Sequence, residues 1–165
     1  MLTLQYLKTI LTGTPGINNV DDQIIESEAG YDGILALLDN RPHADDLVIV
    51  LEHCESGSFE VNPGGVQHAS QTIWVMSMVA FDENRRQIQD NMFSMMRRVV
   101  ATLISKHKDP ELEGWDNGNI PWFITNSANN YTGYQFTLHF DEVTNLTLDQ
   151  FANENSSVDN GGNGN

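Results

Sequence analysis

The most reactive side chains of this sequence stand together at Glu52-His53-Cys54. A carboxylate, an imidazole and a thiol are the groups that acid-base and nucleophilic catalysis use. They follow a short apolar run that predicts a strand, and consecutive strand residues point to opposite faces of a sheet. The three neighbours therefore cannot converge on one substrate atom. We expect no catalytic residue and no enzyme, and a hydrolase that uses these side chains is kept as a third hypothesis.

Metal and nucleotide chemistry lacks its usual spacings. Cys54 has no second cysteine, and the five histidines, His43, His53, His68, His107 and His139, show neither HExxH nor a paired ligand spacing. The acidic pairs Asp21-Asp22 and Asp45-Asp46 lack the alternating pattern of a calcium loop and are predicted to be solvated charge. GxSxG, P-loop and GxGxxG motifs are also missing. We therefore expect no metal and no cofactor.

One amphipathic helix, predicted over Asp82 to Ser105, is the clearest element that could position a site. Asp82 is a plausible N-cap, and Pro110 prevents continuation. The helix carries one apolar stripe at 3- and 4-residue steps, formed by Ile88, Met92, Met95, Met96, Val99, Leu103 and Ile104. We expect the methionines to fill the core, with a special binding surface as the alternative.

The remaining pattern predicts an α+β fold. Short helices are expected at Leu4 to Leu11 and at Asp32 to Leu38, with an acidic connector between them at Asn18 to Glu28. The predicted strands are residues 47–51, 72–81, 120–125 and 134–140. The expected architecture is a mostly antiparallel sheet of about four to five strands, packed against the central helix and the short N-terminal helices. Residues 1–148 form the predicted domain, and 149–165 an Asn/Gly-rich, low-complexity tail.

Two segments are candidates for contacts with another subunit or another protein. In the strand at 72–81, Trp74, Met76 and Met78 point one way and the opposite face is also apolar, so both faces need a cover. One cover is the central helix, and the other is a second helix or another subunit. The preceding connection, Glu52 to Gln71, is long and is predicted to be either a mobile surface loop or a docking arm. The last strand has one polar face, where we expect a solvated His139.

Charge is distributed unevenly along the chain. Eight basic and 23 acidic residues give a net charge of −15, which disfavours sequence-independent binding of nucleic acid. Asp21 to Glu60 holds eleven acidic residues against Arg41 alone, a net charge of −10, whereas residues 82–108 have a net charge of +3. The two are neutralised either within a subunit or between neighbouring copies. No stretch approaches the ~20 apolar residues of a membrane helix, so we expect no membrane partner. The first residues predict an amphipathic helix rather than a secretory segment.

The order of elements resembles the tail-terminator and tail-completion family of tailed bacteriophages, whose members form neck rings. The resemblance spans about Leu2 to Leu146 and is carried mainly by the strand-helix junction WVMSMVAFDENRRQI and the closing strand GYQFTLHF. The acidic segment from Asp21 to Asp46 and the Asn/Gly tail have no counterpart in the family.

This resemblance implies a structural virion protein, assembled in the host cytoplasm, that forms a homo-oligomeric ring at the neck or the head-proximal end of the tail. The implied partners are further copies of the chain and neighbouring neck, portal-side or tail proteins, and DNA passes through without specific binding. In such rings one subunit meets the next heterologously. The residues expected at subunit contacts are Pro63, Gly64, Gly65, Trp74, Met76, Met78, Arg85, Arg86, Arg97 and Arg98.

A small cytoplasmic α+β module is the alternative hypothesis. Such a module would bind a protein or a small ligand with the polar face of its sheet or with the long connection. A stable monomer in solution would favour this module over a ring.

Overall fold

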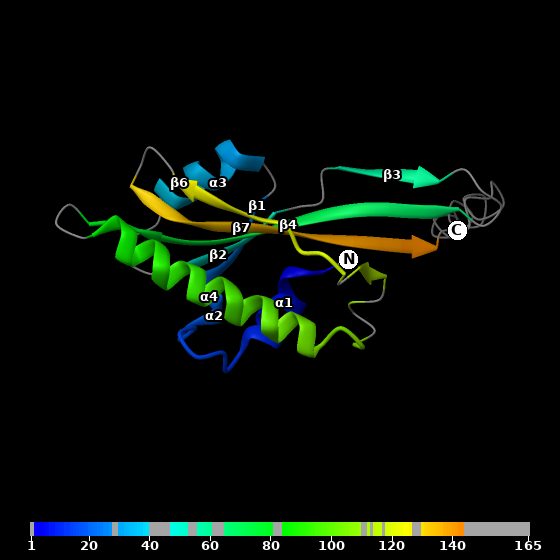
Figure 1. Cartoon of the computed structure of the whole chain (residues 1–165), viewed down its shortest axis with the longest axis horizontal. Coiled ribbons are helices and arrows are strands. Elements are labelled where there is room, and N and C mark those ends of the chain that lie inside the picture. The colour runs from blue at the N-terminus through cyan, green and yellow to red at the C-terminus, as the bar shows by residue number, and fades with distance from the viewer. Residues whose placement is uncertain are drawn as a thin grey trace, which may run out of the picture.

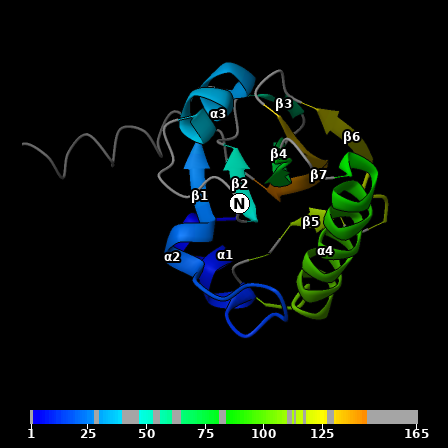
Figure 2. The ribbon, with the colours of Figure 1, turned by 90° about the vertical axis from the view of Figure 1, so that its left-hand side faces the viewer.

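The computed structural model describes residues 2–27, 30–39, 47–52, 56–60, 65–80, 84–109, 112, 114–116, 118–126 and 130–143. One curled sheet carries α1, α2 and α4 on one face and α3 on the other (Figures 1 and 2). The elements are α1 Leu4–Leu11, α2 Val20–Gln23, β1 Ile24–Ser27, α3 Gly30–Asp39, β2 Val48–Glu52, β3 Ser56–Glu60, β4 Val66–Met78, α4 Arg85–Ser105, β5 Trp115–Asp116, β6 Trp122–Asn126 and β7 Tyr131–Val143. The predicted tail at 149–165 lies outside the described residues.

The sheet confirms the α+β class and has more strands than the sequence predicted. Within the described residues the sheet has seven strands in the order β1-β2-β4-β7-β5, with β3 also paired to β4 and β6 also paired to β7. Only β1 and β2 run parallel, joined through α3, and the other pairs are antiparallel. The parallel pair requires a crossover connection, which α3 supplies.

Strands β4 and β7 form the backbone of the sheet. They pair over their whole length, from Val66 opposite Val143 to Met78 opposite Tyr131. The predicted loop at 52–71 is therefore wrong in part, because it contains β3 and the beginning of β4. Its residues are polar and weakly patterned, so their extended conformation depends on the ladder with β7 rather than on local propensity. β3, β4 and β7 continue past the helices as an arm (Figure 1).

The main core lies between the sheet and the helices α1 and α4. Helix α4 buries Met92, Met95, Met96, Val99 and Leu103 there, together with Ile73, Val75 and Phe136 of the sheet. The methionines thus belong to the core, as expected. Helix α4 begins at Arg85, with the Asn84 side chain accepting from the Arg86 backbone N–H at 3.1 Å. Asn84 is the N-cap, whereas the predicted cap Asp82 lies outside the described residues.

A second core lies beneath α3, on the opposite face of the sheet. Its buried members are Ile34, Leu38, Val48, Val50, Trp74, Met76 and Tyr131. The Tyr131 hydroxyl donates to the Leu38 carbonyl at 3.1 Å and so ties β7 to α3. Of the two covers that the sequence left open for this face, the chain itself supplies the helix.

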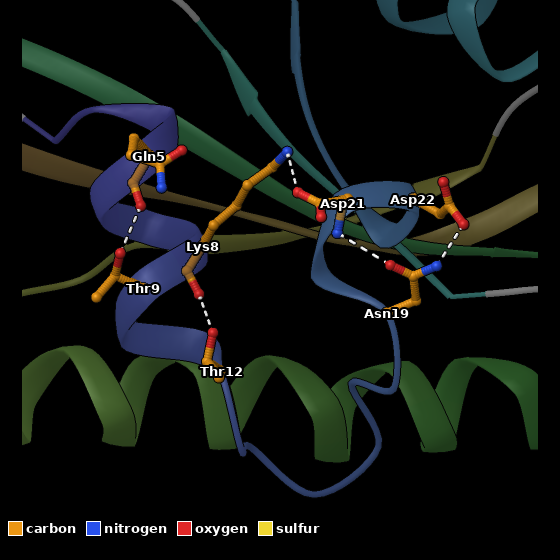
Figure 3. Close-up of polar contacts among 7 residues, drawn as sticks. All are labelled: Gln5, Lys8, Thr9, Thr12, Asn19, Asp21 and Asp22. Atoms are coloured by element: carbon orange, nitrogen blue, oxygen red, sulfur yellow. Dashed lines mark hydrogen bonds and ion pairs between the residues drawn. The ribbon is translucent and has the colours of Figure 1, made fainter.

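The N-terminal segment is tied to the sheet and to the acidic connector. The buried Gln71 side chain accepts from the Leu2 N–H at 3.0 Å and donates to the Leu2 carbonyl at 2.9 Å. Figure 3 shows the connector, where Asn19 caps α2 and bonds to both Asp21 and Asp22. Lys8 pairs with Asp21 at 3.1 Å. The acidic connector predicted at 18–28 thus contains two elements in its described part, α2 and β1.

Candidate subunit interface

An apolar groove of about 420 Å³ lies between the outer flank of α4 and strand β6. We call it the α4–β6 groove. It is lined by Phe93, Met96, Arg97, Val100, Ala101, Ile104, Ile120, Trp122 and Phe136. Phe136 is fully buried and forms the floor. Arg97 is the one charged residue in the lining.

The groove exists because α4 is packed on one flank and open on the other. On the packed flank, Arg98 donates to the Pro15 carbonyl at 2.9 Å. A Cβ at Gly16, whose φ is +96°, would lie 2.3 Å from Cε of Met95, so this loop approaches α4 closely. On the other flank, a stripe of Phe93, Val100 and Ile104 faces the groove, across which Ile120 and Trp122 lie.

A cluster of three aromatic rings fixes β6 to the first half of this flank. The Trp122 ring lies 5.2 Å from that of Phe93 and 5.7 Å from that of Tyr134, between ring centroids. Phe93 and Tyr134 also lie 5.2 Å apart. All three geometries are tilted or edge-on, the arrangement that aromatic pairs prefer. The ring cluster therefore forms one wall of the groove.

The apolar surface continues from the groove onto β6. Ile104 is 43% exposed, Trp122 52% and Ile124 51%. Phe123, at 58%, faces the opposite side of the strand, since successive strand residues alternate. Among the described strands, β6 pairs only with β7, so its other edge is open. An open edge and an adjoining apolar surface are typical of a site for protein association.

Three of the predicted contact residues lie in the core beneath α3. Trp74 and Met76 are buried, at 5% and 0% exposure, and Met78 is partly buried against the same cluster. The Trp74 indole N–H donates to Glu52 Oε2 at 3.0 Å. These side chains are covered within the subunit, so their burial needs no neighbouring copy.

The four predicted arginines have different surroundings. Arg85 donates to Asn126 Oδ1 at 3.4 Å, and Arg98 holds the Pro15 carbonyl. Arg86 and Arg97 are exposed, and within the described ranges no ion pair joins either one to another residue. Of the four, Arg97 lines the groove and has no ion pair with another residue in the described part of the chain.

The glycine-rich connection is described only in part. Pro63 and Gly64 lie outside the described residues, and Gly65 is buried immediately before β4, with φ +42°. Beside it the arm exposes Phe59 of β3, at 57%. Phe59 is opposite Gln67 in the ladder. Phe59 is thus an exposed aromatic residue in the segment for which the sequence left a surface loop and a docking arm as alternatives.

A polar cleft on the arm brings together residues that could do chemistry. It is lined by Gly57, Ser58, His68, Ala69, Ser70, His139 and Asp141. Nδ1 of His68 lies 2.7 Å from Asp141, and Nδ1 of His139 lies 3.0 Å from the Ser70 hydroxyl. His139, expected to be solvated, is partly buried and bonded to Ser70.

The cleft forms no catalytic triad. In a triad the acid orients the same histidine that activates the serine. Here Asp141 bonds to His68, whereas Ser70 bonds to His139. In the described ranges no group of three potential ligands could hold a metal ion. As for the earlier candidates, Glu52 is engaged with Trp74, and His53 and Cys54 lie outside those ranges.

Sequence reasoning missed the exposed apolar residues of β6 and Phe59. A signal existed for β6, because the run Trp122-Phe123-Ile124 is apolar at every position and a strand of that kind is normally covered on both faces. The sequence pattern predicts an ordinary strand of the domain here. Phe59 stood in the segment taken for a loop, so its place on a strand was not anticipated.

No model of a known protein family matches this chain, and no curated protein matches its sequence. In the described part of the chain, no helix has both the length and the apolar character needed to cross a membrane.

Proposed function

We propose that this chain is a structural protein of a tailed-phage virion, forming a homo-oligomeric ring at the neck or the head-proximal end of the tail. It acts there as a tail terminator or head-tail joining protein and carries out no reaction. The observation that supports this best is the α4–β6 groove, continuous with the exposed face of an open edge strand.

Ring formation follows from the kind of contact this surface makes. The groove is concave, and we infer that a projecting part of the next subunit fills it. A contact between unlike surfaces is heterologous, and its repetition gives a ring when the rotation between subunits closes and a filament when it does not. The resemblance in element order and in the junction before α4 supports a ring of the neck type.

The charge of the chain suits a channel for DNA. A ring of copies that each have a net charge of −15 repels passing phosphates, so the genome slides through without being bound. The neighbours of the ring are portal-side, neck or tail proteins, and assembly takes place in the host cytoplasm. A lumen found to be basic would contradict this part of the proposal.

Electron microscopy of the purified protein, alone and on capsids or tails, tests the proposal. We expect closed rings of uniform diameter that bind at one end of the tail or at the capsid vertex. A particle that stays monomeric and binds neither structure would overturn it and favour the ligand-binding module instead.

Binding to the virion also separates the ring from an unrelated self-assembling protein. Rings that form in solution but bind neither capsids nor tails would retain the assembly and refute the place in the virion. The variant Ile124→Lys serves as a control, because it puts a charge on the exposed face of β6 and should abolish rings without unfolding the chain.

A further inference from the structure

We propose that Phe59, on the arm of one copy, inserts into the α4–β6 groove of the next copy. This inference rests on the proposed ring and specifies the contact that would build it. The occupant of the groove is thus a second copy of this chain.

Phe59 has the properties of an interface anchor. It is 57% exposed and stands on β3, the outer strand of the arm that projects past the helices (Figure 1). Single exposed apolar residues are common on protein surfaces. A large aromatic ring on a projecting strand, however, is the kind of residue that dominates binding when it enters an apolar pocket.

The groove has the size and chemistry to accept that ring. A cavity of about 150 Å³ holds a benzene molecule. The α4–β6 groove, at about 420 Å³, accommodates a phenyl ring together with part of the strand that carries it. Val100, Ile104 and Ile120 give it apolar walls, so the ring would replace water against hydrocarbon.

Charge complementarity selects a copy of the same chain as the occupant. Strand β3 contains Glu60 and no basic residue, whereas α4 belongs to the region 82–108, which has a net charge of +3. Arg97 lies in the groove, and within the described residues it forms no ion pair. Docking of the arm would bring Glu60, the one charged residue of β3, toward the Arg97 of the neighbouring copy.

The arm and the groove cannot meet within one subunit. Figure 1 shows β3 and β6 toward opposite ends of the long axis of the sheet. Each copy thus offers an anchor at one end and a groove at the other. This polarity is what a head-to-tail ring contact requires.

The first test compares two exposed phenylalanines. Phe59→Ala should raise the dissociation constant of assembly at least about 30-fold, the effect of an aromatic hot spot. Phe123→Ala is the matched control, since Phe123 is 58% exposed and faces away from the groove. It should change the constant less than about 3-fold. Sedimentation velocity over a concentration series measures both, and circular dichroism verifies that each variant is folded.

A mixing experiment tests the pairing of anchor and groove directly. Phe59→Lys removes the anchor and adds a charge that Arg97 repels, while Ala101→Trp fills the groove from an exposed position on α4. Each variant alone should stay monomeric. Mixed, they retain one intact anchor and one intact groove between them, so they should form 1:1 dimers that grow no further.

The outcomes separate this inference from the ring itself. If the wild type assembles while Phe59→Ala and Phe123→Ala behave alike, or the mixture gives no dimer, the Phe59 contact is refuted and the ring stands. A dissociation constant of about 1 mM corresponds to a binding free energy of about −4 kcal/mol. If the wild type remains monomeric up to that concentration, the ring itself is refuted.

Discussion

The ring of Trp122 on β6 packs against the ring of Phe93 on α4, with centroids 5.2 Å apart and planes inclined by 60°. This pair joins the edge strand to the central helix, as do the hydrogen bonds from Arg85 and Gln89 to Asn126. The apolar groove, which both rings line, lies beside this pair. The stability of β6 and the shape of the groove therefore depend on the same contact.

Replacement of Trp122 by alanine should loosen β6. We expect the free energy of unfolding to fall by about 1–2 kcal/mol, because two aromatic contacts and half of a large apolar side chain are lost. Urea unfolding at a concentration where the protein is monomeric measures the change. Phe123→Ala, on the other face of the same strand, should cost less than half as much. Equal costs would mean that the ring cluster does not fix the strand.

The buried amide of Gln71 should contribute strongly to the stability of the fold. Gln71→Ala leaves the N–H and carbonyl of Leu2 without their bonds, which we expect to cost about 2–3 kcal/mol of unfolding free energy. The matched control is Gln87→Ala, since exposed Gln87 bonds only to Asn91 on the helix surface and should cost about 0.5 kcal/mol or less. Thermal unfolding of the two variants side by side tests the difference. Indistinguishable melting temperatures would contradict it.

The adjacent arginines of α4 should have separable roles. Arg98→Ala removes the bond to the Pro15 carbonyl and should lower the unfolding free energy by about 1 kcal/mol, with little effect on assembly. Arg97→Ala should leave folding unchanged and weaken assembly, because Arg97 faces the groove. Chemical denaturation and sedimentation, applied to both variants, distinguish the two effects. The reverse pattern would remove Arg97 from the interface.

Assembly should weaken as salt concentration rises. At ~0.1 M salt the Debye length is about 10 Å, and at ~1 M it is about 3 Å. Attraction between the acidic segment and the basic helix of neighbouring copies is screened over that range, whereas apolar contacts are not. Light scattering at a fixed protein concentration in increasing NaCl should show a loss of mass. Unchanged mass up to about 1 M would refute the charge pairing between copies.

The sequence predicted the elements that carry their own periodicity. The apolar stripe was sufficient to predict helix α4. The alternation of the last strand, in residues such as Tyr134, Phe136 and Leu138, was sufficient to predict β7. The helix at Asp32 to Leu38 was also predicted, and it forms the inner turns of α3. Such elements are found because each turn or strand pair repeats the same burial, so several residues give one consistent answer.

The strands that the sequence analysis did not predict are held by pairing partners that are distant in the sequence. Strand β1 is four residues long and exists through its parallel ladder with β2, which the local acidic pattern of Asp21-Asp22 conceals. The start of β4 is likewise held by β7, about 70 residues away. No local propensity encodes such pairs.

The candidate site was predicted only through Arg97. The apolar stripe of α4 included Ile104, which the sheet does not cover and which is 43% exposed. The sequence shows the apolar stripe but not where the sheet ends. It therefore does not reveal that part of the stripe is left uncovered by the sheet. The contact from Arg98 to Pro15 joins residues 83 positions apart and was equally hidden.

The mass of the wild-type protein in solution tests the central claim most directly. Sedimentation equilibrium is measured from about 1 μM to about 1 mM protein. Dissociation constants in this range correspond to binding free energies of about −8 to −4 kcal/mol, which are typical of contacts of moderate strength. The account predicts one largest species at a fixed whole-number multiple of 18.5 kDa that does not grow further as concentration rises. A mass of 18.5 kDa throughout, or an unlimited series of larger species, would contradict it.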